Sequence, residues 1–267
     1  MAENSIAALL LKRDGGVLTL TLNRPEVRNA MSLALVLELR QALAAAEADG
    51  QTRVLVLRGA GGHFCAGADL KDMAGARARL DEDPQAITKI NAAFGDLCVA
   101  FANTGLATVA VLEGTVMGGG FGLACVVDVA LAGTSALFRL PETGLGVVPA
   151  QIAPFLVERL GYAEAKRLAV TGATLDARAA LELRLVHAMH AAGALDHAVA
   201  EVLHNILQCA PGAVAATKAL LAQARFHTPA SLVQHAAEVF SQAALGPEGS
   251  EGTAAFLAKR KASWVPQ

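Results

Sequence analysis

The sequence is poor in aromatic and charged residues. Of its 267 residues, 4% are aromatic and 17% are charged, and the formal net charge is −2. Because lysine and arginine are not in excess and form no basic run, we expect neither a nucleic-acid partner nor binding to an anionic membrane surface. Glu113 and Asp128 bound the longest apolar stretch before it reaches membrane-spanning length. We therefore expect a soluble chain.

Signals for export, disulfide bonding and metal binding are also missing. The N-terminal segment has an acidic residue before its short apolar run and lacks the basic region of a signal peptide. The four cysteines are scattered without a Cys-x-x-Cys pair, which indicates reduced, mostly buried thiols in a cytoplasmic protein. His-Glu-x-x-His is absent, and the histidines lack the helical spacing of metal ligands, so we expect no metal site. The cysteines are Cys65, Cys98, Cys125 and Cys209.

Two common enzyme motifs are absent as well. No Gly-x-Ser-x-Gly motif surrounds a serine, so the nucleophile elbow of a hydrolase is missing. A strand predicted at residues 53–58 runs into Gly-Ala-Gly-Gly, but no clear helix follows directly and Gly-Lys-Ser/Thr is absent. A phosphate-binding nucleotide loop is therefore not favoured.

Apolar periodicity divides the chain into an α/β body and a helical end. The pattern predicts strands at residues 6–12, 17–22, 53–58, 106–112, 129–132, 136–140 and 186–190. It predicts helices at residues 32–48, 85–103, 150–161, 162–172 and 176–183. Leu37 and Leu43 are expected on the buried side of the first helix. We therefore expect an α/β body over residues 1–194 and an all-helical region over residues 195–267.

The segment from Thr108 to Leu131 is the most informative part of the chain. A β-branched apolar run ends at Leu112, and three glycines at 118–120 then open onto an apolar segment that is long enough for a buried helix. Glycines let backbone N–H groups approach a bound molecule, and a helix start supplies unpaired N–H groups. The pattern is typical of a site that holds a negatively charged oxygen. A tight turn in a crowded core is the alternative.

One carboxylate stands out beside an apolar strand. Glu142 lies in Leu-Pro-Glu-Thr at the end of the strand predicted at residues 136–140. It is either an acid facing a site or a surface turn glutamate. Arg139 and Gln151 are polar residues close to it in sequence, and period-two alternation places Arg139 on the opposite strand face from Glu142.

Several motifs in order along the chain resemble the crotonase (enoyl-CoA hydratase/isomerase) superfamily. The matching segments are NRPEVRNAM (23–31), FCAGADLKDM (64–73), GTVMGGGFGLACVVDVALA (114–132), FRLPETGLGVVP (138–149) and EGTAAFLAKRKASW (251–264). The resemblance implies a spiral of ββα repeats whose C-terminal helices pack in a homotrimer, commonly paired into a hexamer. It also implies a coenzyme A thioester as substrate and no separate cofactor.

The resemblance also implies roles for individual residues. The backbone N–H groups of Ala68 and Gly119 would polarise the thioester carbonyl and stabilise an enolate oxygen, and Gly118 belongs to the same glycine triplet. Ala66 would line the adenine-side pocket. The nucleotide end would contact Lys71, Phe240 and Lys259, the last two from a neighbouring subunit. The segment 71–80 that begins with Lys71 is either a mobile cover or a solvated helix.

The chain departs from the family pattern at one position. Hydratases that it resembles have two glutamates, and here the second is Glu142 while the first position holds Gly122. We expect Gly122 to leave space for a branched acyl group or an extra water. GGGFG, LPET and PAQIAPF (149–155) are most similar to isohexenylglutaconyl-CoA hydratases. A single glutamate also suits a Δ3-Δ2-enoyl-CoA isomerase, and a binding protein or structural subunit without catalysis remains a further alternative.

Overall fold

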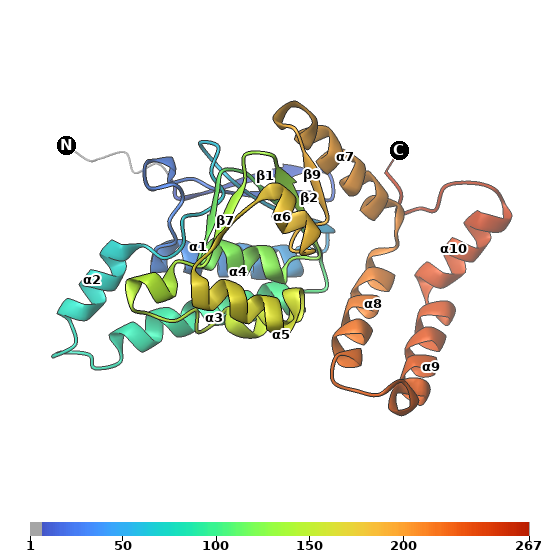
Figure 1. Cartoon of the computed structure of the whole chain (residues 1–267). Helices are drawn as coiled ribbons and strands as arrows, with labels where there is room; N and C mark the ends of the chain where they lie inside the picture. The colour runs from blue at the N-terminus through green and yellow to red at the C-terminus, as the bar shows by residue number, and fades with distance from the viewer. Residues whose placement is uncertain (1–6, 267) are drawn as a thin grey trace.

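A computed structural model describes residues 7–266 and shows one main sheet and one small sheet (Figure 1). In the main sheet, β1 (Leu9–Asp14) pairs antiparallel with β2 (Val17–Leu22), and every later pairing is parallel. The strand order is β1-β2-β3-β4-β6-β9. The remaining strands of this sheet are β3 (Val54–Gly59), β4 (Ala107–Leu112), β6 (Val129–Gly133) and β9 (Ala188–His190). The small sheet contains β5 (Thr115–Met117), β7 (Leu137–Arg139) and β8 (Thr174–Asp176).

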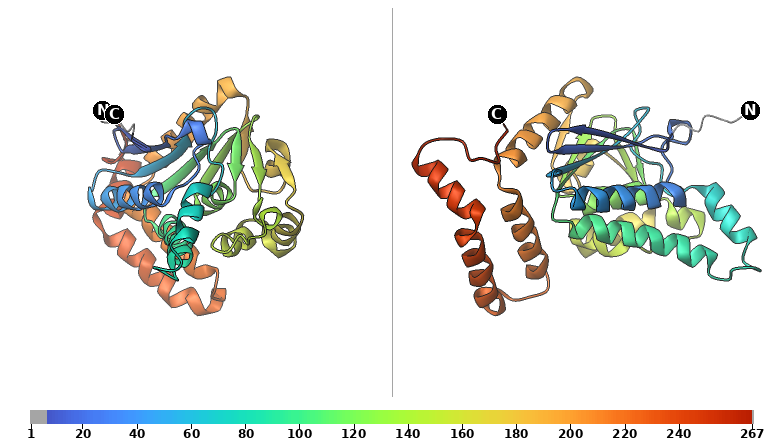
Figure 2. Two further views of the ribbon diagram at one scale, coloured as in Figure 1. Left: turned by 90° about the vertical axis from the view of Figure 1, so that its left-hand side faces the viewer. Right: turned by 180° about the vertical axis from the view of Figure 1, so that it is seen from behind.

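Helices between the strands cover one face of the main sheet (Figures 1 and 2). Leu20 and Leu57 of the sheet join Leu39 and Phe101 of the helices in the larger of two apolar cores. The helices of the body are α1 (Leu33–Ala48), α2 (Leu70–Ala78), α3 (Ala86–Asn103), α4 (Gly119–Val126), α5 (Ala153–Thr171) and α6 (Ala177–Glu182). Non-helical Gly161 divides α5 into the two helices that the sequence predicts.

The C-terminal quarter of the chain is helical and extends away from the body (Figures 1 and 2). It begins with α7, which packs Leu195 and Val199 against the other face of the sheet. We call residues 211–257 the arm. The helices of this region are α7 (Ala192–Gln208), α8 (Pro211–Ala224), α9 (Pro229–Leu245) and α10 (Pro247–Leu257). The predicted α/β fold with a helical C-terminal region is thus confirmed, and the division at residue 194 stays a prediction.

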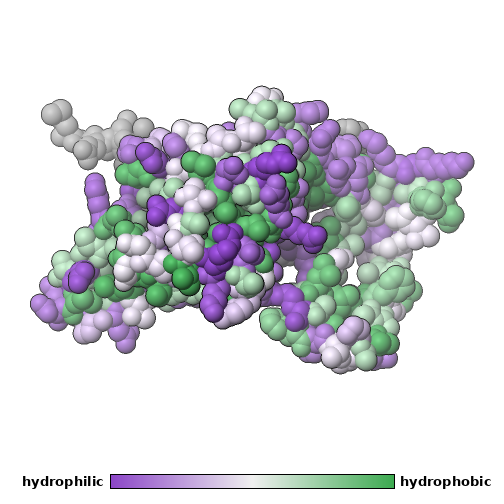
Figure 3. All heavy atoms as spheres, viewed as in Figure 1, coloured by the Kyte–Doolittle hydropathy of each residue, from purple (hydrophilic) through white to green (hydrophobic). Residues whose placement is uncertain are grey.

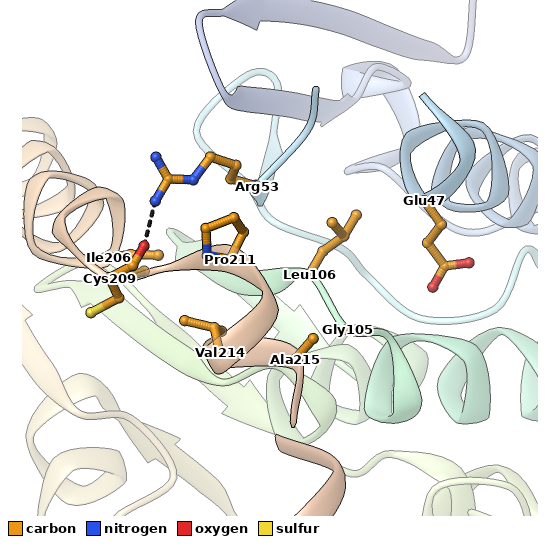
Figure 4. A pocket seen from close by; sticks show the side chains of 9 residues that line it. All are labelled: Glu47, Arg53, Gly105, Leu106, Ile206, Cys209, Pro211, Val214 and Ala215. Atoms are coloured by element: carbon orange, nitrogen blue, oxygen red, sulfur yellow. Dashed lines mark hydrogen bonds between the residues drawn. The ribbon is translucent and has the colours of Figure 1, made fainter. Parts of the chain in front are cut away.

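Polar contacts tie the base of the arm to the body. The Lys218 Nζ atom donates to Asp128 Oδ2 and to the Leu106 carbonyl oxygen, at 2.6 Å in both cases. Arg53 donates to the Leu207, Cys209 and Trp264 carbonyl oxygens, and burial lowers its pKa. A cavity of about 310 Å³ lies at this junction, where Figure 4 shows Arg53 facing Cys209. The carbonyl ends of α7 therefore receive the hydrogen bonds that a helix lacks at its C-terminus.

Two details of the sequence prediction change. Ile6 of the first predicted strand lies outside the described residues, and β1 begins at Leu9. The expectation for Leu37 is wrong, because 49% of this residue is exposed while Leu39 and Leu43 are buried. The buried side of α1, which faces the sheet and α3, therefore differs from the side that we expected to be buried. Within residues 7–266, no helix is long and apolar enough to span a membrane.

Candidate active site

Two glycine-containing loops touch at the centre of the body. The first follows β3 and contains Cys65 and Gly67, and the second joins β5 to α4 and contains Gly118. Backbone hydrogen bonds join the loops, from Cys65 N to Thr115 O and from Met117 N to Cys65 O, at 2.9 Å each. A Cβ added at Gly67 would lie 3.3 Å from the Met117 oxygen, and one at Gly118 would lie 3.5 Å from the Gly67 Cα. Both glycines also have positive φ, so side chains would be strained as well as crowded here.

Backbone N–H groups at residues 68 and 119 follow these two glycines. Met31 N donates to Gly67 O at 2.8 Å and Asp69 N donates to Met31 O at 2.9 Å. In such a parallel bridge the N–H of the intervening residue, Ala68, points away from Met31. Gly119 is the first residue of α4, where an N–H has no acceptor within the helix. Both residues line the same cavity.

Arg24 and α2 stabilise the first loop through Asp69. Its carboxylate pairs with Arg24 at 2.8 Å and accepts from Lys71 N at 2.9 Å, which caps the start of α2. Burial opposes ionisation of Asp69, but the Arg24 and backbone hydrogen bonds outweigh it and lower the pKa. The Ala68 backbone is thus held on both sides. Cys65 beside it is inert, since burial raises the pKa of its thiol to about 12.

The cavity between the loops has a volume of about 170 Å³ and is mostly apolar. Among its lining residues, only Glu142, Asn91 and Gln151 have polar side chains. The cavity is lined by Met31, Leu33, Val36, Ala68, Met73, Ile90, Asn91, Phe94, Gly119, Glu142, Val147, Val148, Pro149, Ala150, Gln151 and Ile152. Any proton transfer by a side chain in this cavity therefore depends on Glu142.

Glu142 faces the cavity, which excludes the surface-turn interpretation. It begins a short 3-10 turn over Glu142–Leu145 after β7. A Cβ at Gly118 would lie 2.9 Å from Glu142 Oε1, so the glycine makes room for the carboxyl group. Glu142 Oε2 is buried and has no hydrogen-bond partner within the described chain. Burial raises the pKa of this carboxyl group, which suits a group that exchanges protons near neutral pH.

Gly122 does not leave the expected space. A Cβ at this position would overlap Cγ2 of Ile152 and lie 3.2 Å from the Ile152 Cβ, and Phe94 is also in contact distance. Gly122 is buried inside α4 and is not among the residues that line the cavity. An apolar side chain from the segment before α5 therefore occupies the room that a larger residue at 122 would need.

The two polar residues near Glu142 in sequence have different positions. Arg139 is exposed, does not line the cavity and donates from Nε to the Gly172 carbonyl oxygen at 2.9 Å. The strand alternation predicted this orientation. Gln151 lines the cavity and donates to Asn91 Oδ1 at 2.7 Å. Sequence reasoning missed Asn91, although Gly95 one turn later in α3 is a signal of close packing at that point.

The residues expected at the nucleotide end lie outside this cavity. Ala66 is partly exposed, and its N–H donates to Arg28 O at 2.9 Å. Lys71 is exposed beside a separate hollow, which shares Leu33 and Ile90 with the cavity. Phe240 is 74% exposed on α9 and lines a hollow among the arm helices. Lys259 is exposed after α10. The single chain brings Ala68, Gly119 and Glu142 together, but not Phe240 and Lys259. Among the described residues, no acidic, histidine or cysteine cluster could hold a metal ion.

The contact between Gly122 and Ile152 generates a stability prediction. Gly122→Ala should destabilise the protein by about 1–3 kcal/mol, because the new methyl overlaps Ile152. In an Ile152→Ala background the same change should cost much less, since the overlapping Cγ2 is gone. Urea denaturation at fixed protein concentration measures both values. Gly75→Ala is the control, because no atom lies within 4 Å of a Cβ there. Equal losses in both backgrounds would contradict the assigned contact.

Comparison with known proteins identifies a family for the chain. The family model described as enoyl-CoA hydratase/isomerase matches residues 12–267. The 2,3-dehydroadipyl-CoA hydratase of Escherichia coli (strain K12) is 31% identical over 259 residues, which is 96% of this chain and 97% of that protein.

Solved structures are similar over nearly the whole chain. Pseudomonas aeruginosa AtuE has a TM-score of 0.93 and 53% identity, covering 97% of this chain and 100% of its own. An enoyl-CoA hydratase/isomerase from Marinobacter aquaeolei has a TM-score of 0.93 and 47% identity, covering 97% and 99%. With the matched model spanning almost all residues, the chain belongs to the enoyl-CoA hydratase/isomerase family of the crotonase superfamily.

Proposed function

We propose that the protein is an enoyl-CoA hydratase-type lyase that adds water to a 2-enoyl-CoA thioester. The observation that carries this proposal is the position of Glu142. It is the one titratable side chain that lines the cavity, and its buried Oε2 has no hydrogen-bond partner within residues 7–266. Ala68 and Gly119 line the same cavity and have N–H groups available for a thioester oxygen. The family relationship supports a hydratase-type activity on an acyl-CoA.

The proposed reaction uses one carboxylate twice. The N–H groups of Ala68 and Gly119 hold the thioester oxygen as its charge grows, which polarises the C2=C3 bond. Ionised Glu142 takes a proton from water while the water oxygen bonds to C3, and the electrons of the double bond form the enolate. Protonated Glu142 then gives that proton to C2 and is ionised again. The product is a 3-hydroxyacyl-CoA, and the enzyme ends in its starting state.

For the substrate we propose a branched or glutaconyl-type acyl group. The cavity has a volume of about 170 Å³, and its mostly apolar wall suits the hydrocarbon part of an acyl group. Similarity to isohexenylglutaconyl-CoA hydratases in GGGFG, LPET and PAQIAPF supports a glutaconyl-type acid. The Escherichia coli relative is a 2,3-dehydroadipyl-CoA hydratase, and its name also describes a dicarboxylic acyl group.

The second candidate is a Δ3-Δ2-enoyl-CoA isomerase. Isomerisation moves one proton between two carbons and needs no ordered water. The absence of an acid at Gly122, with Ile152 in its place, favours this candidate because the residues lining the cavity include no second carboxylate to hold a water molecule. A binding protein without catalysis is the third possibility, and turnover of any enoyl-CoA would exclude it.

A panel of CoA esters in ¹⁸O-labelled water separates these functions. We expect a 3-branched 2-enoyl-CoA to gain one labelled oxygen and to react faster than crotonyl-CoA. Mass spectrometry of the products measures both results. Fast conversion of a 3-enoyl-CoA to its 2-enoyl isomer without label would establish the isomerase instead, and no turnover of any ester would leave the binding protein.

Glu142→Gln should remove turnover, by ~10²–10⁴-fold, because the amide cannot accept the proton of water. It should also make the protein more stable at neutral pH. Burial raises the pKa of Glu142 in the folded protein. Ionisation of Glu142 therefore lowers the stability of wild type as the pH rises from its pKa in the unfolded chain through its pKa in the folded protein. The variant's advantage in unfolding free energy should therefore be absent below this window and grow across it. Urea denaturation at several pH values measures it, with exposed Glu182→Gln as control. A variant that remains active would contradict the assignment.

We also propose that the protein forms a homotrimer that pairs into a hexamer, with Phe240 and Lys259 reaching a neighbouring subunit's coenzyme A. Large apolar side chains are exposed along the arm, and Figure 3 shows apolar surface on these helices. They are Leu221, Phe226, Val233, Phe240, Leu245, Phe256 and Leu257. So much apolar surface on one segment is typical of a protein interface.

Truncation before Gly249 removes α10 except for its first two residues, together with Lys259, and should act on assembly and binding together. We expect smaller species in analytical ultracentrifugation, because apolar contacts of the arm are lost, and weaker CoA binding in calorimetry. Lys261→Ala is a control beyond α10 that leaves the helices intact. A truncated protein that remains a full oligomer and binds CoA normally would overturn the proposal.

A further inference from the structure

A linked pair of amide side chains lies on the wall of the active-site cavity. Asn91 comes from α3 and Gln151 from the segment before α5, and Gln151 Nε2 donates to Asn91 Oδ1 at 2.7 Å. The pair has no role in the proton transfers that are assigned to Glu142. It accounts for all the polar side chains of the cavity lining other than Glu142.

Gly95 leaves room for the side chain of Gln151. A Cβ at Gly95 would overlap Gln151 Oε1 and lie 2.7 Å from Gln151 Cδ. Glycine inside a helix costs ~1 kcal/mol relative to alanine, and Gly95 lies in the middle of α3. The close contact explains why the helix carries a glycine at this point. Packing thus orients Gln151 and leaves its Nε2 directed to the partner on α3.

The pair keeps three N–H groups for a bound molecule, while Gln151 Oε1 packs against Gly95 of α3. An amide nitrogen carries two N–H groups, so Gln151 keeps one after bonding to Asn91. Asn91 keeps both of its own, because its oxygen accepts that bond. The surrounding wall is apolar, with Ile90, Phe94 and Val148 among its members. Preorganised donors at an apolar wall match a substrate oxygen and offer nothing to a hydrocarbon chain.

We propose that Asn91 and Gln151 determine specificity for acyl groups that carry a second carboxylate, by donating hydrogen bonds to its oxygens. This inference rests on the proposed function and names the residues that select the glutaconyl-type acid. Neutral donors suit this position because no lysine or arginine lines the cavity. The substrate carboxylate is therefore held by amide N–H groups at the exposed Asn91 side of the cavity, where water also solvates it.

Two substrates of equal shape test the proposal. 3-Methylglutaconyl-CoA carries the carboxylate, and 3,5-dimethylhex-2-enoyl-CoA has an isopropyl group in its place. Asn91→Asp keeps the acceptor for Gln151 but replaces both free donors with a negatively charged oxygen. We expect kcat/KM for the dicarboxylic substrate to fall by at least about 100-fold and that for the isopropyl analogue to change less than about threefold. Gln151→Leu should lower the first value by about 10- to 100-fold, the size typical of hydrogen bonds to a charged group.

The outcomes separate this inference from the hydratase proposal. Asn103→Leu, at the far end of α3, is the control and should change neither value. Equal losses with both substrates, or equal wild-type kcat/KM values for both, would show that the pair only fastens α3 to the loop and would overturn the inference.

If wild type hydrates neither ester, the function proposal fails, and calorimetry with saturated 3-methylglutaryl-CoA and 3,5-dimethylhexanoyl-CoA decides the inference. Loss of a carboxylate preference in Asn91→Asp supports it, and no preference in wild type contradicts it.

Discussion

The close approach of Gly67 and Gly118 is the constraint on which the site depends. The two loops come from separate strands, and a Cβ at either position would lie within 4 Å of the opposite backbone. Because both positions are glycine, the residues that follow them, Ala68 and Gly119, line one cavity with available N–H groups. Fixed backbone donors need no reorganisation when charge develops on a substrate oxygen. The chemistry therefore requires small residues here rather than charged ones.

A single buried acid then gives the cavity its reactivity. Gly118 also leaves room for the carboxyl group of Glu142, so one glycine positions both the donor loop and the acid. Desolvation raises the Glu142 pKa because the ionised form has lost water and Oε2 has no hydrogen-bond partner among the described residues. Ile152, which fills the place beside Gly122, is one of the apolar residues that line the same cavity as this acid.

The sequence predicted what depends on local pattern. The strand, glycine triplet and helix around residues 108–131 could be predicted, because apolar periodicity and glycine turns depend on the local sequence. The outward direction of Arg139 followed from strand alternation. The role of Glu142 followed from the family resemblance, because the residues alone also allowed a surface turn glutamate. The sequence could not predict that Ile152 fills the space at Gly122, because this contact depends on how the segment before α5 packs on α4. The Asn91–Gln151 pair could not be predicted for the same reason. The exposure of Leu37 could not be predicted either, since tertiary packing decides which side of a helix is buried.

The structure of Glu142→Gln bound to a 3-branched 2-enoyl-CoA tests the central claim most directly. The account predicts that the thioester oxygen lies ~2.7–3.2 Å from the backbone nitrogens of both Ala68 and Gly119. It also predicts that the side chain at residue 142 faces C2 and C3 of the acyl group. A thioester oxygen bonded to neither nitrogen, or an acyl group bound away from residue 142, would contradict the account.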